Sequence, residues 1–220
     1  MSTFDVAAAT TENRIRFADA VDALPPELHH APTLCAGWDV HVLTAHQLQP
    51  MAVGFLRFVV ASLRHRGDVD ATVDALARRL AQRPLPELTA QLRALSHRAV
   101  SPPRVGPYGP FADSCIHLRD LARPLGLDVD VPLAHWRAVL DYLVADGAAP
   151  TLVPAGRLAG LALRATDQDW SHGGDASGQE VAGPSEALAM ATTGRAVALA
   201  DLAGPGVKLL AGRLGAGAER

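Results

Sequence analysis

The sequence predicts a mainly α-helical protein, with a helical bundle over residues 1–147 and a small α+β domain over residues 148–220. Apolar residues recur at helical spacing through the first part, where connections rich in proline or glycine separate the periodic segments. After Gly147 the composition shifts toward glycine, proline and short alternating segments. A chain of 220 residues can bury a sizeable core without disulfides.

The first elements are defined by proline and by a capping residue. Residues 5–23 are predicted to form an amphipathic helix that ends before Pro25-Pro26, because proline cannot continue it. Asp39 is the expected N-cap of a long helix that runs to about Arg66. Pro50 lies inside this helix and lacks the N–H that would bond the carbonyl of residue 46. A kink is therefore expected at His46.

The next helices of the bundle follow the same logic. They are expected over residues 68–83 and 86–99, and the Pro/Gly-rich run Ser101–Pro110 is predicted to be a connection. A helix that carries Asp113 and His117 follows and is closed by Pro124 and Gly126. One more helix is expected from Pro132 to about Asp146.

The C-terminal part predicts shorter elements. Leu161, Leu163 and Ala165 alternate with Ala162, Arg164 and Thr166, which favours a strand, and residues 173–178 are expected to form a turn-rich loop. Short helices are predicted over 184–193 and 206–214. The tail beyond Gly215 is expected to fray.

Bulk properties exclude several classes of protein. A net charge of −3 argues against nucleic-acid binding, which needs a cationic surface. The N-terminus lacks the basic start and apolar run of a signal peptide, and the apolar stretches are too short to span a membrane. The two cysteines cannot form a disulfide framework. We therefore expect a soluble cytoplasmic protein. The sequence leaves a homodimer as an open alternative, because no apolar stripe marks a dimer interface.

The segment Asp113-Ser-Cys-Ile-His117 carries the clearest chemistry. Side chains at i and i+4 are neighbours on one helix face, so Asp113 and His117 can supply two metal ligands, with His46 as the third. Three N and O ligands leave a coordination position open, as in catalytic sites. Asp120 can accept the second ring N–H of His117, bind solvent in the site or act as a base.

Each of these residues also has a purely structural interpretation. The Asp–His pair can be a plain ion pair, and His46 can be a core imidazole with an ordinary hydrogen-bond partner. Cys115 is rejected as a ligand because it lies about 200° around the helix from Asp113. Cys35 is interpreted as a small buried hydrophobe rather than a reactive thiol, and Trp38 as a packing anchor.

Three stretches of the chain resemble one known family. Pro32-Thr-Leu-Cys-Ala-Gly-Trp38, with His46 eight residues after the tryptophan, resembles the entry into the second helix of mycothiol-dependent maleylpyruvate isomerase-like proteins. These belong to the DinB-like superfamily of metal-binding four-helix bundles. A second signature of the family resembles His117-Leu-Arg-Asp120-Leu-Ala-Arg-Pro124-Leu-Gly126. The family's small C-terminal domain is similar to Leu163-Arg-Ala-Thr-Asp167 through Trp170, then Gly183-Pro184 and Thr193-Gly194-Arg195.

The resemblance implies a DinB-like four-helix bundle with a small C-terminal α+β domain, and a zinc site. In the family, zinc is held by a histidine on the second helix and a Glu-x-x-x-His pair on the fourth, which correspond to His46, Asp113 and His117. Aspartate stands where the isomerases carry glutamate, so reach, denticity or the choice of metal can differ. The implied thiol is mycothiol, the low-molecular-weight thiol of actinobacteria. Arg123 and Arg195 lie in family-like motifs and are candidates for binding an anionic substrate or the thiol.

Three functions stay open from the sequence. The first is a metal-dependent enzyme that activates a thiol for isomerisation of, or S-transfer to, a small electrophile. The second is a non-catalytic helical module that binds a small molecule and in which Asp113 is a degraded ligand. The third is a metal-dependent hydrolase in which Asp120 is the base. Metal content separates the first from the second.

Overall fold

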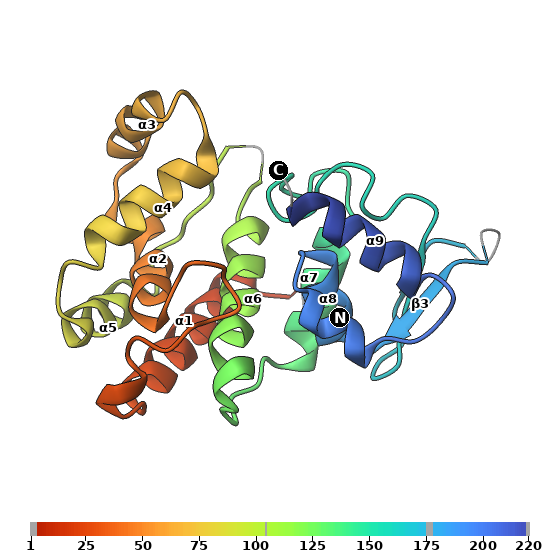
Figure 1. Ribbon diagram of the computed structural model, residues 1–220. Coiled ribbons are helices and arrows are strands. Elements are labelled where there is room, and N and C mark those ends of the chain that lie inside the picture. The colour runs from red at the N-terminus through yellow and green to blue at the C-terminus, as the bar shows by residue number, and fades with distance from the viewer. Residues whose placement is uncertain (1–3, 104, 175–177, 219–220) are drawn as a thin grey trace. The chain divides into compact units, whose positions relative to one another are not determined.

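The computed structural model describes residues 4–103, 105–174 and 178–218. This part of the chain confirms a mainly helical fold with a small sheet near the C-terminus (Figure 1). The chain divides into two compact units. The first comprises residues 1–100 and 113–131, and the second comprises residues 101–112 and 132–220.

The first unit is helical. Its elements are α1 (Val6–Asp22), the 3-10 helix η1 (Pro26–Leu28), α2 (Val40–Ala52), α3 (Phe55–Arg64), α4 (Val69–Leu80), α5 (Leu85–Leu95) and the part of α6 (Tyr108–Leu125) that begins at Asp113. Asp5, Asp39 and Asp68 cap α1, α2 and α4, because each carboxylate accepts a backbone N–H of the first turn. The N-cap predicted at Asp39 is thus confirmed.

The single long helix expected from Asp39 to Arg66 is wrong. Helix α2 ends at Ala52, Val53 and Gly54 are extended, and α3 begins at Phe55. Pro50 lies inside α2, so the chain ends this helix shortly after the proline instead of continuing past a kink at His46. Helix α3 has no buried residue, and Phe55 is 68% exposed. The apolar periodicity that joined the two segments therefore does not mark one continuous core face.

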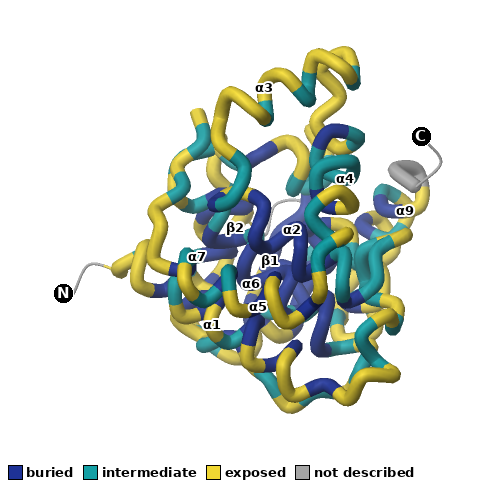
Figure 2. Tube along the Cα trace, turned by 90° about the vertical axis from the view of Figure 1, so that its left-hand side faces the viewer, coloured by how far each residue is buried: buried dark blue, intermediate teal, exposed yellow. Residues whose placement is uncertain are grey.

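The core of the first unit lies where α2 packs on its neighbours. Ala45 and Leu48 of α2 pack with Leu88 of α5 in one buried cluster. Every residue from Leu43 to Gln49 is buried, so α2 is enclosed on all sides over this stretch (Figure 2). His46 lies in the middle of it. A polar ring at such a position needs a partner, which is the physical basis for looking for a site here.

The described residues of the second unit form helices and a small sheet. Strand β1 (Ala162–Ala165) pairs antiparallel with β2 (Ser171–His172) and parallel with β3 (Glu180–Gly183), which gives the order β2-β1-β3. The helices are α7 (Leu133–Leu143), α8 (Ser185–Thr192) and α9 (Val207–Ala218), with the 3-10 helix η3 (Ala196–Asp201) between the last two. Helix α7 packs on α8, and Trp170 Nε1 donates to Asp141 Oδ1 at 2.8 Å.

Several expectations for the C-terminal part can be compared with this unit. The strand and the short helix after Pro184 are confirmed. The last helix was expected to end at residue 214, which is wrong because α9 continues past Gly215 to Ala218; the fraying of the tail stays a prediction. The loop expected over 173–178 lies partly outside the described residues. Helix α7 groups with the second unit, but the domain boundary at residue 147 stays a prediction, since contacts in the folded chain do not show which segment folds independently.

The helices give no sign of a membrane span. Over the described ranges, none is both long enough and apolar enough to cross a bilayer.

Candidate metal centre

Helix α6 brings three polar side chains to one face. Asp113, His117 and Asp120 are spaced by four and three residues, and these spacings place side chains one above another on a helix. The opposite face is apolar, with Cys115 and Leu118 fully buried. Amphipathic patterning therefore fixes the rotation of α6 and directs the three polar groups to the same side.

His46 of α2 meets this face. Its Nε2 lies 3.5 Å from Asp113 Oδ2, and His117 Nε2 lies 3.1 Å from Asp113 Oδ1. One donor atom from each of the three residues falls within 4.8 Å of the other two. The structure therefore brings together the three residues that the sequence predicted as ligands. Aspartate is long enough to reach both imidazoles, although the resembling family carries glutamate there.

The second ring nitrogen of His117 is bonded to Asp120. His117 Nδ1 lies 2.9 Å from Asp120 Oδ2, and the carboxylate of Asp120 is fully buried. A carboxylate can only accept, so this contact places a proton on Nδ1 and leaves a lone pair on Nε2 of the neutral ring. That lone pair points at Asp113 Oδ1, another acceptor. A cation between them, either a metal ion or a proton on Nε2, removes the repulsion.

This donor set fits a divalent metal. Two imidazole nitrogens and one carboxylate are typical ligands of catalytic zinc, and the Asp120 contact is the usual outer partner of a ligating histidine. His46 departs from that pattern. Its Nδ1 is buried without a hydrogen-bond partner in the described part of the chain. The ring of Trp38 packs against His46 instead, with ring centroids 4.8 Å apart.

The charges in the cluster shift the ionisation of both partners. Burial disfavours the cationic form of His117, but the negative charges of Asp113 and Cys35 and the hydrogen bonds to Asp113 and Asp120 together hold the pKa of His117 well above its usual range. Burial likewise disfavours the Asp113 carboxylate, and the charges of His117 and His46 nevertheless hold its pKa well below normal. Without a metal, the proton on His117 neutralises Asp113.

Two further residues, which the sequence pattern did not indicate, also contact Asp113 or lie near it. Gln47 Nε2 donates to Asp113 Oδ2 at 3.3 Å. Arg14 of α1 is buried, and burial lowers its pKa while the charge of Asp113 raises it. Its Nη1 donates to the carbonyls of Ser96 and Arg98 at 2.9 and 3.0 Å. Gln47 follows a predicted ligand directly in sequence, which is the only signal that could have found it.

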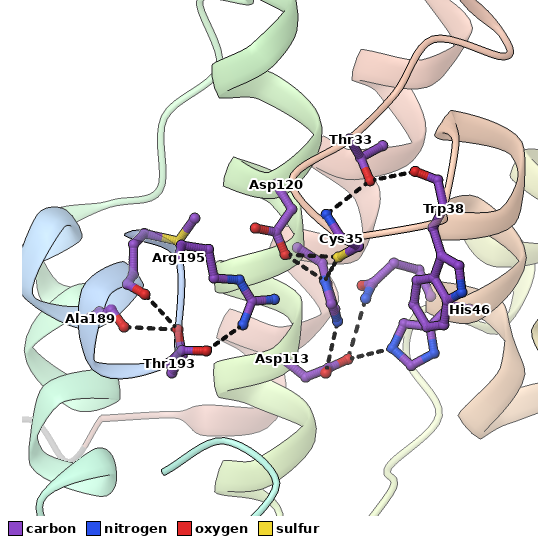
Figure 3. A network of polar contacts seen from close by, with 12 residues as sticks. Thr33, Cys35, Trp38, His46, Asp113, Asp120, Ala189, Thr193 and Arg195 are labelled. Atoms are coloured by element: carbon purple, nitrogen blue, oxygen red, sulfur yellow. Dashed lines mark hydrogen bonds and ion pairs between the residues drawn. The ribbon is translucent and has the colours of Figure 1, made fainter. Parts of the chain in front are cut away.

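The loop that precedes α2 places a thiol at the cluster. Cys35 Sγ lies 3.1 Å from Asp120 Oδ2 and 3.4 Å from His117 Nδ1 (Figure 3). The interpretation of Cys35 as a small buried hydrophobe is therefore wrong, since the residue is half-buried and bonded to polar groups. Cys35, His117 and Asp120 form a second group whose atoms could hold a metal.

The same loop orients Trp38. Its Nε1 donates to Asp74 Oδ1 of α4 at 2.7 Å, and Arg78 pairs with the same carboxylate at 2.9 Å. Arg78 Nη2 also donates to the Gly37 carbonyl at 2.9 Å. Trp38 is thus an anchor, as predicted, but it anchors the ring that packs on His46 rather than a general core.

One comparison with known proteins bears on this site. Residues 10–105 match the family model described as the mycothiol maleylpyruvate isomerase N-terminal domain. The N-terminal part of the chain belongs to this family. No curated protein and no solved structure gave a significant match.

The mycothiol maleylpyruvate isomerase N-terminal domain covers only part of the cluster. It includes Cys35, Trp38 and His46, whereas Asp113 and His117 lie beyond its matched residues. The match therefore supports the family and the loop–helix half of the site, and the geometry of α6 supports the other half. The metal-binding role of the three residues remains a prediction.

The two arginines predicted to bind substrate or thiol occupy different units. Arg123 is half-buried in the last turn of α6. Arg195, in the second unit, is half-buried at the start of η3, where its Nη1 donates to the Thr193 carbonyl at 2.9 Å (Figure 3). Their roles remain predictions. Cys115, rejected as a ligand, is buried and accepts a hydrogen bond from Asn13 Nδ2 at 3.0 Å.

Proposed function

We propose that the protein is a metal-dependent enzyme that activates a low-molecular-weight thiol, with mycothiol the expected thiol, for isomerisation of or S-transfer to a small electrophile. The observation that carries the proposal is the convergence of His46 Nε2, His117 Nε2 and the Asp113 carboxylate. The family of the N-terminal domain supports the identity of the thiol and the reaction class.

His46, Asp113 and His117 would hold one divalent metal, with zinc the expected ion. Two neutral imidazoles and one carboxylate leave such an ion with net positive charge. Three protein ligands also leave a coordination position open for a further ligand. When bound, the ion would stabilise a thiolate over a thiol at neutral pH. The rival function is a helical module that binds a small molecule without turnover. Such a module needs no set of metal ligands.

The residues around the ligands have supporting roles. Asp120 keeps the proton on His117 Nδ1, so that the Nε2 lone pair is directed at the metal position. Gln47 donates to one oxygen of Asp113 and restrains the carboxylate between the two imidazoles. Asp120 is fully buried and already accepts from His117, which favours orientation over action as a base toward water. A hydrolase is therefore the weaker proposal.

Two reactions need the same activated sulfur. Reversible addition to a conjugated alkene permits rotation about the former double bond, and its reversal gives the other geometric isomer. Displacement on an electrophile instead forms a C–S bond while the leaving group departs with its bonding electron pair, so the sulfur stays in the product. Arg123 and Arg195 would suit an anionic substrate or the polar groups of the thiol. The cytoplasm is the expected location, because low-molecular-weight thiols are kept reduced there.

The test is a reconstituted reaction. Zinc-loaded protein is incubated with mycothiol and maleylpyruvate, and conversion to the trans isomer is followed by absorbance. A second assay measures consumption of the thiol with an alkylating electrophile. We expect turnover in at least one assay, and its loss when zinc or mycothiol is omitted or when His117 is replaced by alanine. A zinc-loaded protein that is silent in both assays contradicts the proposal and favours the binding module.

A further inference from the structure

Cys35 and His117 share one carboxylate oxygen. Asp120 Oδ2 lies 2.9 Å from His117 Nδ1 and 3.1 Å from Cys35 Sγ. The two donors come from different elements, His117 from α6 and Cys35 from the loop before α2. Asp120 is fully buried, so water cannot readily replace a donor that is removed from its carboxylate.

The backbone of the loop fixes the position of the thiol. Leu34 N donates to the Asp120 carbonyl at 3.1 Å, which ties the loop to α6 at the same residue whose side chain accepts from Cys35. Within the loop, Cys35 N donates to Thr33 Oγ1 at 3.2 Å (Figure 3). Trp38 N donates to the Cys35 carbonyl at 3.0 Å. The thiol is thus held on both sides by hydrogen bonds of its own backbone.

We propose that Cys35 is a positioning residue of the metal centre, which donates its S–H to Asp120 and so fixes the carboxylate that orients His117. This inference rests on the proposed function, because it assigns Cys35 a role at that same site. Each donor to a carboxylate restrains rotation about its terminal torsion. The donor from the loop adds to this restraint and, through Asp120, to the restraint on the imidazole.

The rival role for Cys35 is that of a metal ligand, together with His117 Nδ1 and Asp120. A neutral imidazole has one lone pair. A metal at Nδ1 would therefore leave the proton on Nε2, and His117 would be lost to the group with His46 and Asp113. The two groups compete for one ring. The group with His46 is favoured because the thiol of Cys35 and the Nδ1–H of His117 both already have an acceptor in Asp120.

The experiment compares zinc affinities of the full-length wild type, Cys35→Ala and Cys35→Ser by competition with a chromophoric chelator. The visible spectrum of the cobalt-substituted proteins is recorded without added thiol. Outer partners of ligating residues contribute 10–100-fold to metal affinity, so we expect about a tenfold loss in Cys35→Ala. Cys35→Ser keeps a donor and should bind closer to the wild type. Cys115→Ala is the matched control, because it removes a thiol from the core face of α6.

The outcomes separate the inference from the proposed function. The positioning role is supported if zinc binding is weaker in Cys35→Ala and recovers in Cys35→Ser. The control Cys115→Ala should then be thermally less stable but keep the zinc affinity of the wild type. Equal affinities in the wild type and Cys35→Ala overturn it and leave the proposed metal centre intact. A thiolate-to-cobalt charge-transfer band in the wild type that Cys35→Ser abolishes also overturns it, in favour of a ligand role. No metal binding by the wild type contradicts both.

Discussion

His117 Nδ1 lies 2.9 Å from Oδ2 of the fully buried Asp120, and this contact decides what the rest of the site can do. It fixes the proton of the neutral ring on Nδ1, so Nε2 presents a lone pair to Asp113. Two acceptors that face each other in a buried cluster require a cation. In the metal-free protein that cation is a proton, and in the proposed holoenzyme it is a divalent metal.

The first prediction concerns Asp120 itself. Asp120→Asn is nearly isosteric but removes the charge, and its amide can turn N–H groups toward His117 Nδ1. We expect zinc affinity to fall by about 10–100-fold, the range typical of outer-shell partners. Chelator competition measures it. An affinity within twofold of the wild type would show that Asp120 does not orient the ligand.

The second prediction concerns the carboxylate ligand. Asp113→Glu should retain stoichiometric zinc, because the longer carboxylate also reaches the imidazoles of His46 and His117 on either side. Asp113→Asn should lose it, because a neutral amide leaves no anionic ligand. Metal content of the purified variants is the measurement. Equal zinc in Asp113→Asn and the wild type would mean that the carboxylate is not a ligand.

The third prediction is a pH dependence of the metal-free protein. The pKa of His117 lies well above its usual range because the charge of Asp113, together with Cys35 and the hydrogen bonds to Asp113 and Asp120, exceeds the cost of burial. This pair therefore stabilises the fold fully below about pH 6.5, the ordinary histidine value, and its contribution is lost as pH rises through the raised pKa. The lowered pKa of Asp113 sets the acid limit of this stabilisation. The stability that the Asp113 carboxylate contributes is lost as pH falls through that lowered pKa.

Thermal melting of metal-free protein checks this window. From about pH 6.5 upward the melting temperature should fall more steeply in the wild type than in His117→Gln, which has no proton to lose there. Zinc-loaded wild type should show a flatter profile, because the metal replaces the proton. Parallel profiles for the metal-free wild type and His117→Gln would count against the His117–Asp113 pair.

The fourth prediction separates the two cysteines. Cys115 is fully buried, and burial raises the pKa of its thiol, whereas Cys35 is half-buried in a loop. A disulfide reagent should modify one thiol in the native protein and the second only after denaturation. Cys35→Ser should abolish the native reaction. Two fast thiols in the native state, or one that survives in Cys35→Ser, would contradict the assignment.

The helical fold and the three candidate ligands were predictable because they depend on local spacing. Asp113 and His117 are neighbours through helix periodicity alone, and His46 stands out as an imidazole on an apolar helix. Cys35 was misjudged because its contacts are set by the hydrogen bond from Leu34 to the Asp120 carbonyl, between segments far apart in sequence. No period or cap in the sequence encodes that pairing.

The break between α2 and α3 was missed for a different physical reason. Apolar residues continue at helical spacing across Gly54, and periodicity does not distinguish a buried face from an exposed one. Phe55 is on the exposed side, so apolar spacing there predicts a helix that has no buried face. Pro50 and Gly54 together were the stronger signal, since both disfavour a continued helix.

The most direct measurement is the metal content of the purified wild type beside a His46→Ala, His117→Ala double variant, with Cys115→Ala as a control for altered packing. We expect close to one divalent metal per chain in the wild type and in Cys115→Ala, and its loss in the double variant. A wild type that holds no metal, even after reconstitution with zinc, would contradict the metal centre on which the proposed function rests.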